Sequence, residues 1–231
     1  MFCHQPICGF VIVMSLLAAS AQQQPSDELQ KVLHQMDQTA ADFRTTQAAF
    51  VWDQYQKVVE EHDLQKGKVY FRRSGNGIEM AAEITDPSPK YVLFTDSKVE
   101  VYQPKIDQVT RYNTGKDRAT VESFLVLGFG GSGKDMLKSF DVKYIGGEKV
   151  EGVDTAKLEL VPRSVKGHNM FDHIWLWVDT SKGVSVQQQL FEPSGDYRLA
   201  KYSDIQLNQK IPDSVFKLKT TGKTKVVSPQ G

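Results

Sequence analysis

Residues 67–112 constrain the fold most, because they consist of short segments in which apolar and polar residues alternate. Such alternation places successive side chains on opposite faces of a β-strand. In the first segment Val69, Phe71 and Arg73 share one face, and the residues between them point the other way. A guanidinium on an apolar face needs an acceptor, because leaving a buried charge unpaired is costly.

The segments that follow predict further antiparallel strands with the same apolar face. After the turn signal Gly75-Asn76-Gly77, the next strand places four apolar side chains together: Ile78, Met80, Ala82 and Ile84. Strands are also expected over residues 91–94, 99–102 and 108–112, with a turn at Asp96-Ser97 between the first two. The segment therefore reads as a β-meander.

A series of loose motifs runs through the chain in a fixed order: Gly67 to Arg73, Thr95-Asp96-Ser97, Tyr102-Gln103-Pro104, Leu158 to Pro162, Ile174 to Asp179, Tyr202 to Ile205, Asn208, Ile211-Pro212-Asp213 and Phe216. This order resembles the periplasmic outer-membrane lipoprotein carrier family, LolA and its relatives. Ser74 and Ser97 stand where that family usually has a proline and a turn glycine. The resemblance implies a mainly β fold, an incompletely closed antiparallel β-barrel with an N-terminal helix and with lid helices over an apolar cavity.

The first 21 residues predict a secretory signal peptide. They contain no Lys, Arg, Asp or Glu, are apolar from Phe10 to Ala19, and end in the small-x-small pattern Ala19-Ser20-Ala21. The apolar run is shorter than the roughly 20 residues that a membrane span needs. We expect removal after Ala21, which leaves residues 22–231 as a single carrier domain in the periplasm; an uncleaved anchor is the alternative.

Composition excludes several classes of protein. The two cysteines, Cys3 and Cys8, both lie in the signal segment, so the mature chain would have neither a disulfide nor a catalytic thiol. The 28 basic and 28 acidic residues balance to a net charge of zero. A nucleic-acid binder normally carries a basic excess, so we expect no nucleic-acid partner.

The residues around the meander predict the other elements. Ser26 is expected to cap a helix with apolar residues at helical spacing: Leu29, Val32, Leu33, Met36, Ala40 and Phe43. A strand is expected over about 47–60 and short helices over 117–127 and 135–140. Strands return from Phe140 onward, with turns expected at Gly146-Gly147, 181–183 and 193–196.

The segment from Gly128 to Lys134 matches the G-x-x-x-x-G-K pattern of phosphate-binding loops. Asp135 follows the lysine, where a Mg²⁺-binding hydroxyl is required, and a parallel α/β context is missing. We therefore interpret the segment as a glycine hinge between two lid helices, with a plain flexible loop as the alternative.

Catalytic and metal-binding patterns are weak. His168, Asp172 and His173 have no second cluster to complete four metal ligands. The charged run Glu60 to Asp63 is interpreted as a hydrated turn, and the sequence contains no G-x-S-x-G nucleophile elbow. We expect a protein that is not an enzyme and that needs neither a metal nor another cofactor.

The candidate ligand-binding residues are the apolar side chains of the cavity and lid, together with one arginine: Arg73, Val69, Phe71, Phe50, Trp52, Met80, Ile84, Leu93, Leu125, Leu127, Phe129, Trp175 and Trp177. The resemblance implies that Arg73 tethers the lid when the cavity is empty and is released when lipid enters. The alternative places Arg73 outward after a β-bulge and gives the inward position to Arg72.

The function implied by the resemblance is that of a carrier for the acyl chains of lipoproteins, or for another lipid, in transit to the outer membrane. The implied partners are an inner-membrane release complex and an outer-membrane acceptor, and we expect a monomer. An envelope stress sensor of similar fold, which binds mislocalised lipoprotein, is the alternative. Lysines in the C-terminal segment are interpreted as a solvated edge strand and tail, or as a docking patch: Lys217, Lys219, Lys223 and Lys225.

Overall fold

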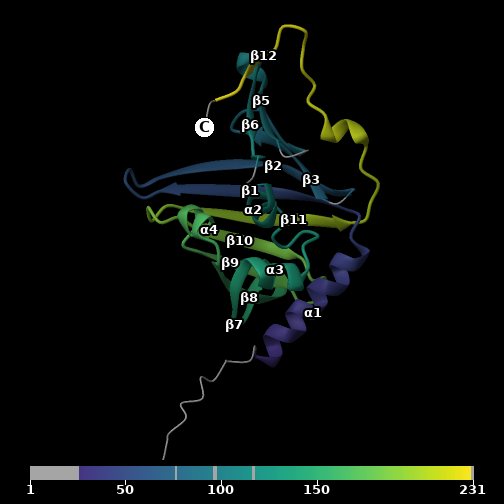
Figure 1. The fold of residues 1–231 in the computed structure, drawn as a ribbon, viewed down its shortest axis with the longest axis vertical. Helices are drawn as coiled ribbons and strands as arrows, with labels where there is room; N and C mark the ends of the chain where they lie inside the picture. Colours follow the sequence, from purple (N-terminus) through teal and green to yellow (C-terminus); the bar gives the residue numbers. More distant parts are fainter. Residues whose placement is uncertain (1–25, 76, 96–97, 116–117, 230–231) are drawn as a thin grey trace, which may run out of the picture.

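Alternating sequences throughout the chain fold into one curved twelve-stranded sheet in a computed structural model, which describes residues 26–229 except 76, 96, 97, 116 and 117 (Figure 1). Its strands are β1 (Thr45–Gln56), β2 (Glu61–Ser74), β3 (Gly77–Asp86), β4 (Lys90–Thr95), β5 (Lys98–Gln103), β6 (Gln108–Asn113), β7 (Phe140–Val150), β8 (Val153–Pro162), β9 (His173–Asp179), β10 (Ser185–Phe191), β11 (Tyr197–Leu207) and β12 (Lys225–Val227). The expected signal peptide and the turn at Asp96-Ser97 lie outside the described residues.

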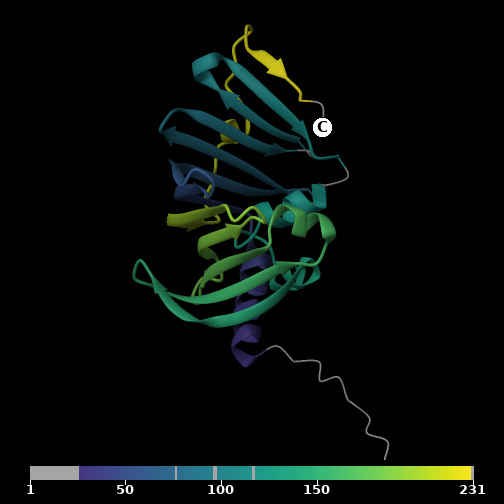
Figure 2. The ribbon, with the colours of Figure 1, turned by 90° about the vertical axis from the view of Figure 1, so that its left-hand side faces the viewer.

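The strand order is β12-β6-β5-β4-β3-β2-β1-β11-β10-β9-β8-β7. All neighbours are antiparallel except β12, which runs parallel to β6. Because β7 and β12 form the two edges and do not pair with each other within the described part of the chain, the barrel stays open. This confirms the expected mainly β, incompletely closed architecture, and Figure 2 shows the strands fanning apart along the long axis.

Helix α1 (Asp27–Asp42) begins where the sequence predicts, because the Ser26 hydroxyl accepts a hydrogen bond from the Leu29 amide at 3.3 Å. Its apolar stripe is buried against the sheet: Leu29, Val32, Leu33, Met36 and Ala40. Helices α2 (Arg118–Leu125) and α3 (Gly133–Ser139), with the loop between them, are called the lid. The described residues also include the 3₁₀ turns η1 (Pro104–Ile106) and η3 (Asp213–Phe216). Helix α4 (Val165–Met170), which contains His168, was not predicted by the sequence analysis.

The sheet has an inner face, which packs against α1 and the lid, and an outer face. Strands β8 and β9 contribute fully buried inner side chains: Leu158, Leu160, Ile174, Leu176 and Val178. Burial of each such side chain contributes roughly 1.5–3 kcal/mol. The inner face is therefore the main core of the molecule, and it holds α1 and the lid in place.

The C-terminal segment covers part of the outer face. Ile211 and Phe216 pack there against a small cluster that includes Tyr70 and Leu93. Arg72, on the same face, forms ion pairs with Glu79 and Asp213 and lies 4.2 Å from the centre of the Phe216 ring. Strand β12 then forms the predicted edge strand.

The first hairpin differs from the sequence prediction. Strand β1 ends at Gln56, which pairs with Glu61, so the turn lies at residues 57–60 and residues 61–63 belong to β2. Glu60 takes a left-handed φ of 55°, which permits the chain reversal. The prediction of a strand to residue 60 and of a hydrated turn at 60–63 was wrong, because extended pairing with β1 continues to the end of the hairpin.

A second turn is also displaced. Gly146 and Gly147 lie inside β7, where the register with β8 shifts between Tyr144 and Gly146. The chain reverses instead at Glu151 and Gly152, whose φ angles are 47° and 88°. Glycines within a strand often mark a bulge, and here they bend the edge strand without ending it.

None of the helices in the described ranges is long and apolar enough to cross a membrane. Among the same residues, no group of three or more His, Cys, Asp or Glu side chains is placed to hold a metal ion.

Candidate functional site

Most of the predicted site residues meet on the inner face beneath the lid. They belong to one apolar cluster built by β1, β2, β3 and the lid: Phe50, Trp52, Val69, Phe71, Met80, Ile84, Leu125 and Phe129. Strand register explains the grouping, since Phe71 lies opposite Met80 and Val69 lies opposite Ala82. Side chains that lie opposite each other on paired strands share a face.

Phe129 is the centre of this cluster. Its side chain descends from the lid and is fully buried. The ring stacks on Phe71 with centroids 5.1 Å apart and meets Tyr202 edge-on at 4.7 Å. A lid side chain thus occupies the inner face of the sheet.

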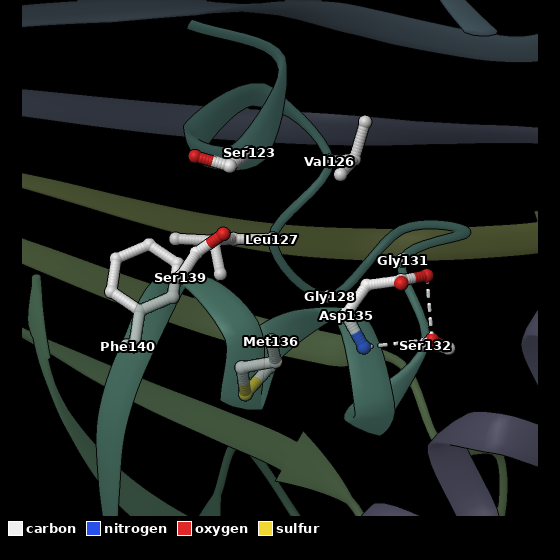
Figure 3. A pocket seen from close by; sticks show the side chains of 10 residues that line it. All are labelled: Ser123, Val126, Leu127, Gly128, Gly131, Ser132, Asp135, Met136, Ser139 and Phe140. Carbon is white, nitrogen blue, oxygen red and sulfur yellow. Dashed lines mark hydrogen bonds between the residues drawn. The ribbon is translucent and has the colours of Figure 1, made fainter. Parts of the chain in front are cut away.

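A small pocket lies within the lid, between α2 and α3 (Figure 3). It encloses about 70 Å³ and is lined by lid residues and by Phe140 at the start of β7. Sites for small-molecule ligands usually enclose about 300–1,000 Å³. This pocket is too small for an acyl chain, and Phe129 from the lid covers the apolar inner face, so a chain could enter only after the lid moves.

Hydrogen bonds hold the lid loop against β10. The buried amide of Gln188 donates to the carbonyl oxygen of Leu127, and the Ser185 backbone amide donates to Gly128 at 3.0 Å. Gln188 was missed by the sequence analysis. The sequence did carry a signal for it. Gln188 lies two residues from the apolar Val186 and Leu190, so it shares their face of the strand and places a polar group on the inner face.

Both ends of the lid are fastened as well. The Glu122 carboxylate of α2 accepts a hydrogen bond from the Ile78 backbone amide at 3.0 Å, at the start of β3. At α3, the Lys134 backbone amide donates to Asp37 of α1 at 3.1 Å. The lid thus bridges β3, β10 and α1.

Two lid glycines permit this close packing. A Cβ on Gly128 would overlap the Cβ of Ser185, and a Cβ on Gly130 would lie 2.6 Å from the Phe43 ring. Both residues have left-handed φ angles, 77° and 82°. Glycine is therefore required here by contact as well as by backbone conformation.

Arg73 lies at the rim of the inner face, where β2 ends. Its Nε donates to the carbonyl oxygen of Phe43 and its Nη2 to that of Ala40, each at 3.2 Å. Both carbonyls lie at the C-terminal end of α1, the negative end of the helix dipole, and the Ala40 carbonyl also accepts from the Phe43 amide at 3.4 Å. Arg72 points to the outer face, so the two arginines occupy opposite faces.

A pocket of about 290 Å³ lies beside Arg73, between the end of α1 and the lid. Its charged lining residues are Asp37, Arg73, Lys134 and Asp135. The Lys138 ammonium and the Ser132 hydroxyl lower the pKa of Asp135, which is therefore ionised at neutral pH. This rim is polar and of mixed charge, in contrast to the apolar surface below it.

The interior carries few polar atoms. Burial raises the pKa of the Tyr202 phenol, which therefore stays neutral. The Thr46 side chain is fully buried, and its hydroxyl has no hydrogen-bond partner among the described residues.

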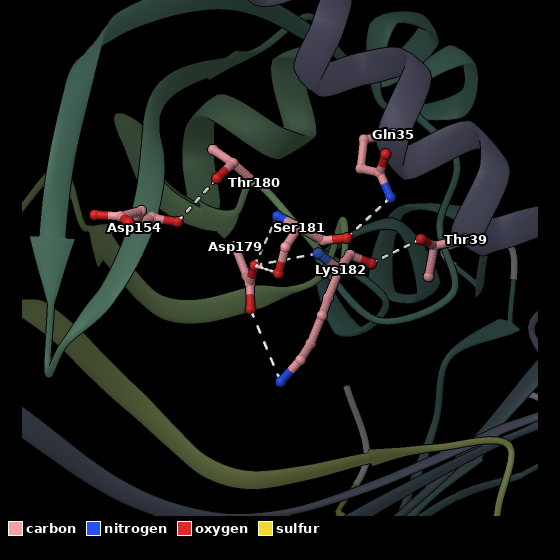
Figure 4. A network of polar contacts seen from close by, with 7 residues as sticks. All are labelled: Gln35, Thr39, Asp154, Asp179, Thr180, Ser181 and Lys182. Carbon is pink, nitrogen blue, oxygen red and sulfur yellow. Dashed lines mark hydrogen bonds and ion pairs between the residues drawn. The ribbon is translucent and has the colours of Figure 1, made fainter.

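The turn between β9 and β10 braces α1 from another side (Figure 4). Thr39 of α1 donates to the carbonyl oxygen of Lys182 at 2.7 Å, and Gln35 donates to that of Ser181 at 3.2 Å. The buried Asp179 carboxylate shapes the turn by accepting from the amides of both turn residues. Helix α1 is thus tied to the sheet by this turn and by Arg73.

Leu93, Trp175 and Trp177 lie on the outer face, away from the lid. The expectation that they line the cavity is corrected by their strand register, since Phe94 and Ile174 take the inner positions of β4 and β9. The Lys157 ammonium lies 3.8 Å from the Trp175 ring centre, and the Trp177 indole donates to Glu148 at 2.9 Å. Leu127 is on the inner face, but it packs in the neighbouring cluster with α1.

Comparison with known proteins agrees with this geometry. A family model described as the outer membrane lipoprotein carrier protein LolA matches residues 41–219. The chain belongs to this family. An outer-membrane lipoprotein carrier protein from Dechloromonas aromatica (strain RCB) is 25% identical over 174 residues, which cover 75% of this chain and 76% of that protein.

Solved structures share the fold at low sequence identity. The crystal structure of MucB superposes with a TM-score of 0.54 and 12% identity, and covers 87% of this chain; the chain spans 66% of that structure's length. An uncharacterised conserved protein from Thermus thermophilus superposes with a TM-score of 0.55 and 12% identity, over 87% of this chain and 99% of the other. These likenesses show that the fold is shared.

The arginine of the LolA-like strand motif has a different partner from the one implied by the resemblance. Arg73 donates to the end of α1, and the lid itself is tied by Gln188 and Glu122. The physical reason is position: α1 ends directly beside the last residues of β2, so the carbonyls at its C-terminal end are the nearest acceptors.

Proposed function

We propose that this protein is a periplasmic carrier that binds the acyl chains of a lipoprotein, or another lipid, against the inner face of its sheet and passes them toward the outer membrane. The observation that carries the proposal is the insertion of Phe129 from the lid into the apolar inner face, where it stacks on Phe71. A removable apolar plug over an apolar surface is the arrangement that a reversible acyl-chain site requires. Membership of the LolA family supports the same function.

Binding then works by exchange of apolar contacts and involves no covalent step. An incoming chain displaces Phe129 and gains about 0.8 kcal/mol for each buried CH₂. The cost is the loss of Phe129 packing and of the lid hydrogen bonds made by Gln188 and Glu122. These opposing contributions keep the affinity low enough for release.

Arg73 and the braced turn at Lys182 keep α1 attached while the lid opens. The mixed-charge pocket beside Arg73 is then positioned for the polar part of the cargo. Delivery between membranes implies an inner-membrane donor complex and an outer-membrane acceptor, as expected for a LolA-family carrier. Removal of residues 1–21 would place the carrier in the periplasm.

Native mass spectrometry of the protein purified from an envelope fraction tests the proposal. We expect a co-purifying species heavier by one acylated molecule. The binding of a fluorescent fatty acid gives a second readout. Phe71→Asp, which places a charge on the inner face, should abolish probe binding, whereas Tyr112→Ala, at a 48% exposed position on β6, should leave it unchanged.

Phe129→Ala tests the role of the lid side chain separately from that of the inner face beneath it. Removal of the plug enlarges the space beneath the lid, so probe affinity should rise, even though the protein is destabilised by about 3–5 kcal/mol. The absence of both an acylated species and probe binding in the parent protein would contradict the carrier function.

A further inference from the structure

The outer face of the sheet carries a row of aromatic rings across five adjacent strands. His62, Tyr55, Tyr197, Phe191 and His173 are successive register partners on β2, β1, β11, β10 and β9. Ring centroids are 4.9 Å apart for the first pair, 5.0 Å for the second, 6.3 Å for the third and 4.2 Å for the fourth. None of the five is buried: His62 is exposed and the other four are partly exposed.

The next row on the same face adds apolar area. Leu64, Leu199 and Trp175 follow the aromatic row by two residues along their strands. Leu64 is 52% exposed, and Leu199 and Trp175 are partly exposed. Monomeric proteins seldom expose a contiguous apolar and aromatic area of this kind without a use for it.

The third row brings positive charge. Lys66, Lys201 and Lys157 are placed in one line across β2, β11 and β8, because each is in register with the residues between them. Acids lie beside this row: Asp86 is in register with Lys66, and Glu148 accepts from the Trp177 indole over which Lys157 lies. Lys201 makes a 3.6 Å pair with Glu151, a solvent-exposed contact of little energetic weight.

Glu60 is exposed at the hairpin tip, whereas the other acidic residues near the aromatic row are directed elsewhere or paired. Glu61 and Asp63 alternate with His62 and therefore point to the other face of β2. Asp53 shares the face, but its carboxylate contacts the His62 ring nitrogen at 2.9 Å and is only 19% exposed.

The tip of the β1–β2 hairpin extends this surface. Figure 1 shows the hairpin reaching beyond the neighbouring strands, beside the β10–β11 turn. At the tip Val58 is 92% exposed and Val59 is 55% exposed. The Lys57 backbone amide donates to Asp196 at 2.8 Å, which holds the tip to the β10–β11 turn.

We propose that this outer surface docks on the surface of a phospholipid bilayer that contains anionic lipid. The apolar tip and the aromatic rows then enter the interfacial layer, where Tyr and Trp side chains with a polar end are favoured. The lysine row, set back by two strand positions, reaches lipid phosphates. We choose a bilayer as the partner because the apolar tip, the aromatic rows and the lysine row follow one another along the strands. This order matches the depth at which a bilayer accepts apolar, aromatic and basic side chains.

The surface lies on the face opposite to the lid, so docking does not depend on the cargo proposed above. Vesicle co-sedimentation of the cargo-free full-length mature protein tests it directly. Vesicles of phosphatidylethanolamine and phosphatidylglycerol supply the anionic surface, and vesicles of phosphatidylcholine alone supply the neutral one. We expect binding to the first that weakens as salt rises.

Lys66→Gln with Lys201→Gln should lower partitioning onto the anionic vesicles by about tenfold or more, since each lysine near such a surface contributes about fivefold. Lys98→Gln with Lys105→Gln removes the same charge from exposed positions far along the sheet and is the matched control. Val58→Asp should weaken binding to a similar degree. Val165→Asp, at a 79% exposed position on α4, is its control.

Circular dichroism of each variant shows whether it is folded. Failure of the parent protein to bind anionic vesicles, or equal loss in the test and control variants, would overturn the proposal. Binding that needs a proteinaceous membrane extract and fails with pure lipid would replace the bilayer by a protein partner. Loss of fatty-acid binding has no bearing on these outcomes, so the carrier function and the docking surface can fail separately.

Discussion

Two polar side chains hold the helices over the inner face: Arg73 holds α1, and Gln188 holds the lid. Arg73 caps α1 at the exposed rim, and Gln188 bonds the lid loop from a buried position. Exposure makes the first bond weak, and burial makes the second costly to lose. The two residues should therefore have different effects when replaced.

Gln188→Ala should open the lid more often. The carbonyl oxygen of Leu127 would lose its buried donor, and such a loss costs about 1–3 kcal/mol. We expect hydrogen exchange at the amide of Phe129, which bonds Val126 at 2.9 Å in the closed lid, to rise about tenfold or more. Gln189→Ala, on the outer face of the same strand, is the control, and equal exchange in both variants would contradict the assignment.

Arg73→Leu should weaken the attachment of α1. Because Asp37 of α1 also holds the Lys134 amide of the lid, the lid should loosen as well and leave the carrier in its open, loaded form. Two hydrogen bonds from a charged donor at an exposed site contribute about 1.5 kcal/mol at least, so delivery of a fluorescent acylated cargo to acceptor membranes should fall about tenfold.

Arg72→Leu is the control that shows whether the delivery defect comes from the inner or the outer face. Arg72 is paired with Glu79 and Asp213 on the outer face, so its loss should loosen the C-terminal segment and lower stability, with delivery nearly unchanged. A delivery defect confined to Arg72→Leu would show that the face assignment is wrong.

At the scale of elements, the lid is a pair of short helices, and the glycine loop that joins them also contacts α1 and the sheet. Gly130 touches Phe43, whereas Gly131 has an ordinary φ and a Cβ added there would approach only Val126, at 3.2 Å.

The C-terminal segment is a second element that packs on the sheet. Its β12 end is tied to β6 through Asp107, which accepts hydrogen bonds from Thr224 and Thr221.

Gly131→Ala should slow cargo exchange by stiffening the hinge, with little change in stability. Gly130→Ala should instead destabilise the closed lid, because a left-handed φ costs a non-glycine residue about 1 kcal/mol or more and the Phe43 ring must shift.

Lys134→Ala should leave cargo binding unchanged. ATP binding that disappears in Lys134→Ala would restore the phosphate-loop interpretation.

The anchoring of β12 should depend on pH. Hydrogen bonds from Thr224, Thr221 and Tyr102 lower the pKa of Asp107 below its value of 3.8 in an unfolded chain. Its contribution is therefore present above pH 3.8 and is lost as the pH falls through the lower folded-state value. Hydrogen exchange at residues 225–227 should accelerate in that acidic range, and Asp107→Asn should remove this dependence while weakening the anchor at neutral pH.

At the scale of the whole molecule, an open sheet gives two independent faces. The inner face is covered by α1 and the lid, and the outer face is covered only in part by the C-terminal segment. A carrier can use such an arrangement to hold cargo on one side while the other side contacts a membrane.

Export should yield a mature protein that begins at Gln22, because the small-x-small pattern ends at Ala21. Intact-mass measurement of the protein recovered from the periplasmic fraction checks this. Retention of Met1, or a lipid attached to Cys8, would contradict cleavage at this position.

The sequence by itself determined the strand meander, helix α1 with its Ser26 cap and the inner position of Val69, Phe71 and Met80, because alternation and helical spacing are local properties. The tertiary structure decided that Arg73 meets α1, that Gln188 ties the lid and that Phe129 fills the space beneath it. It also decided which apolar face of β9 turns inward, since Trp175 and Ile174 are equally apolar in sequence. These outcomes depend on which distant segments come into contact, and local periodicity carries no information about that.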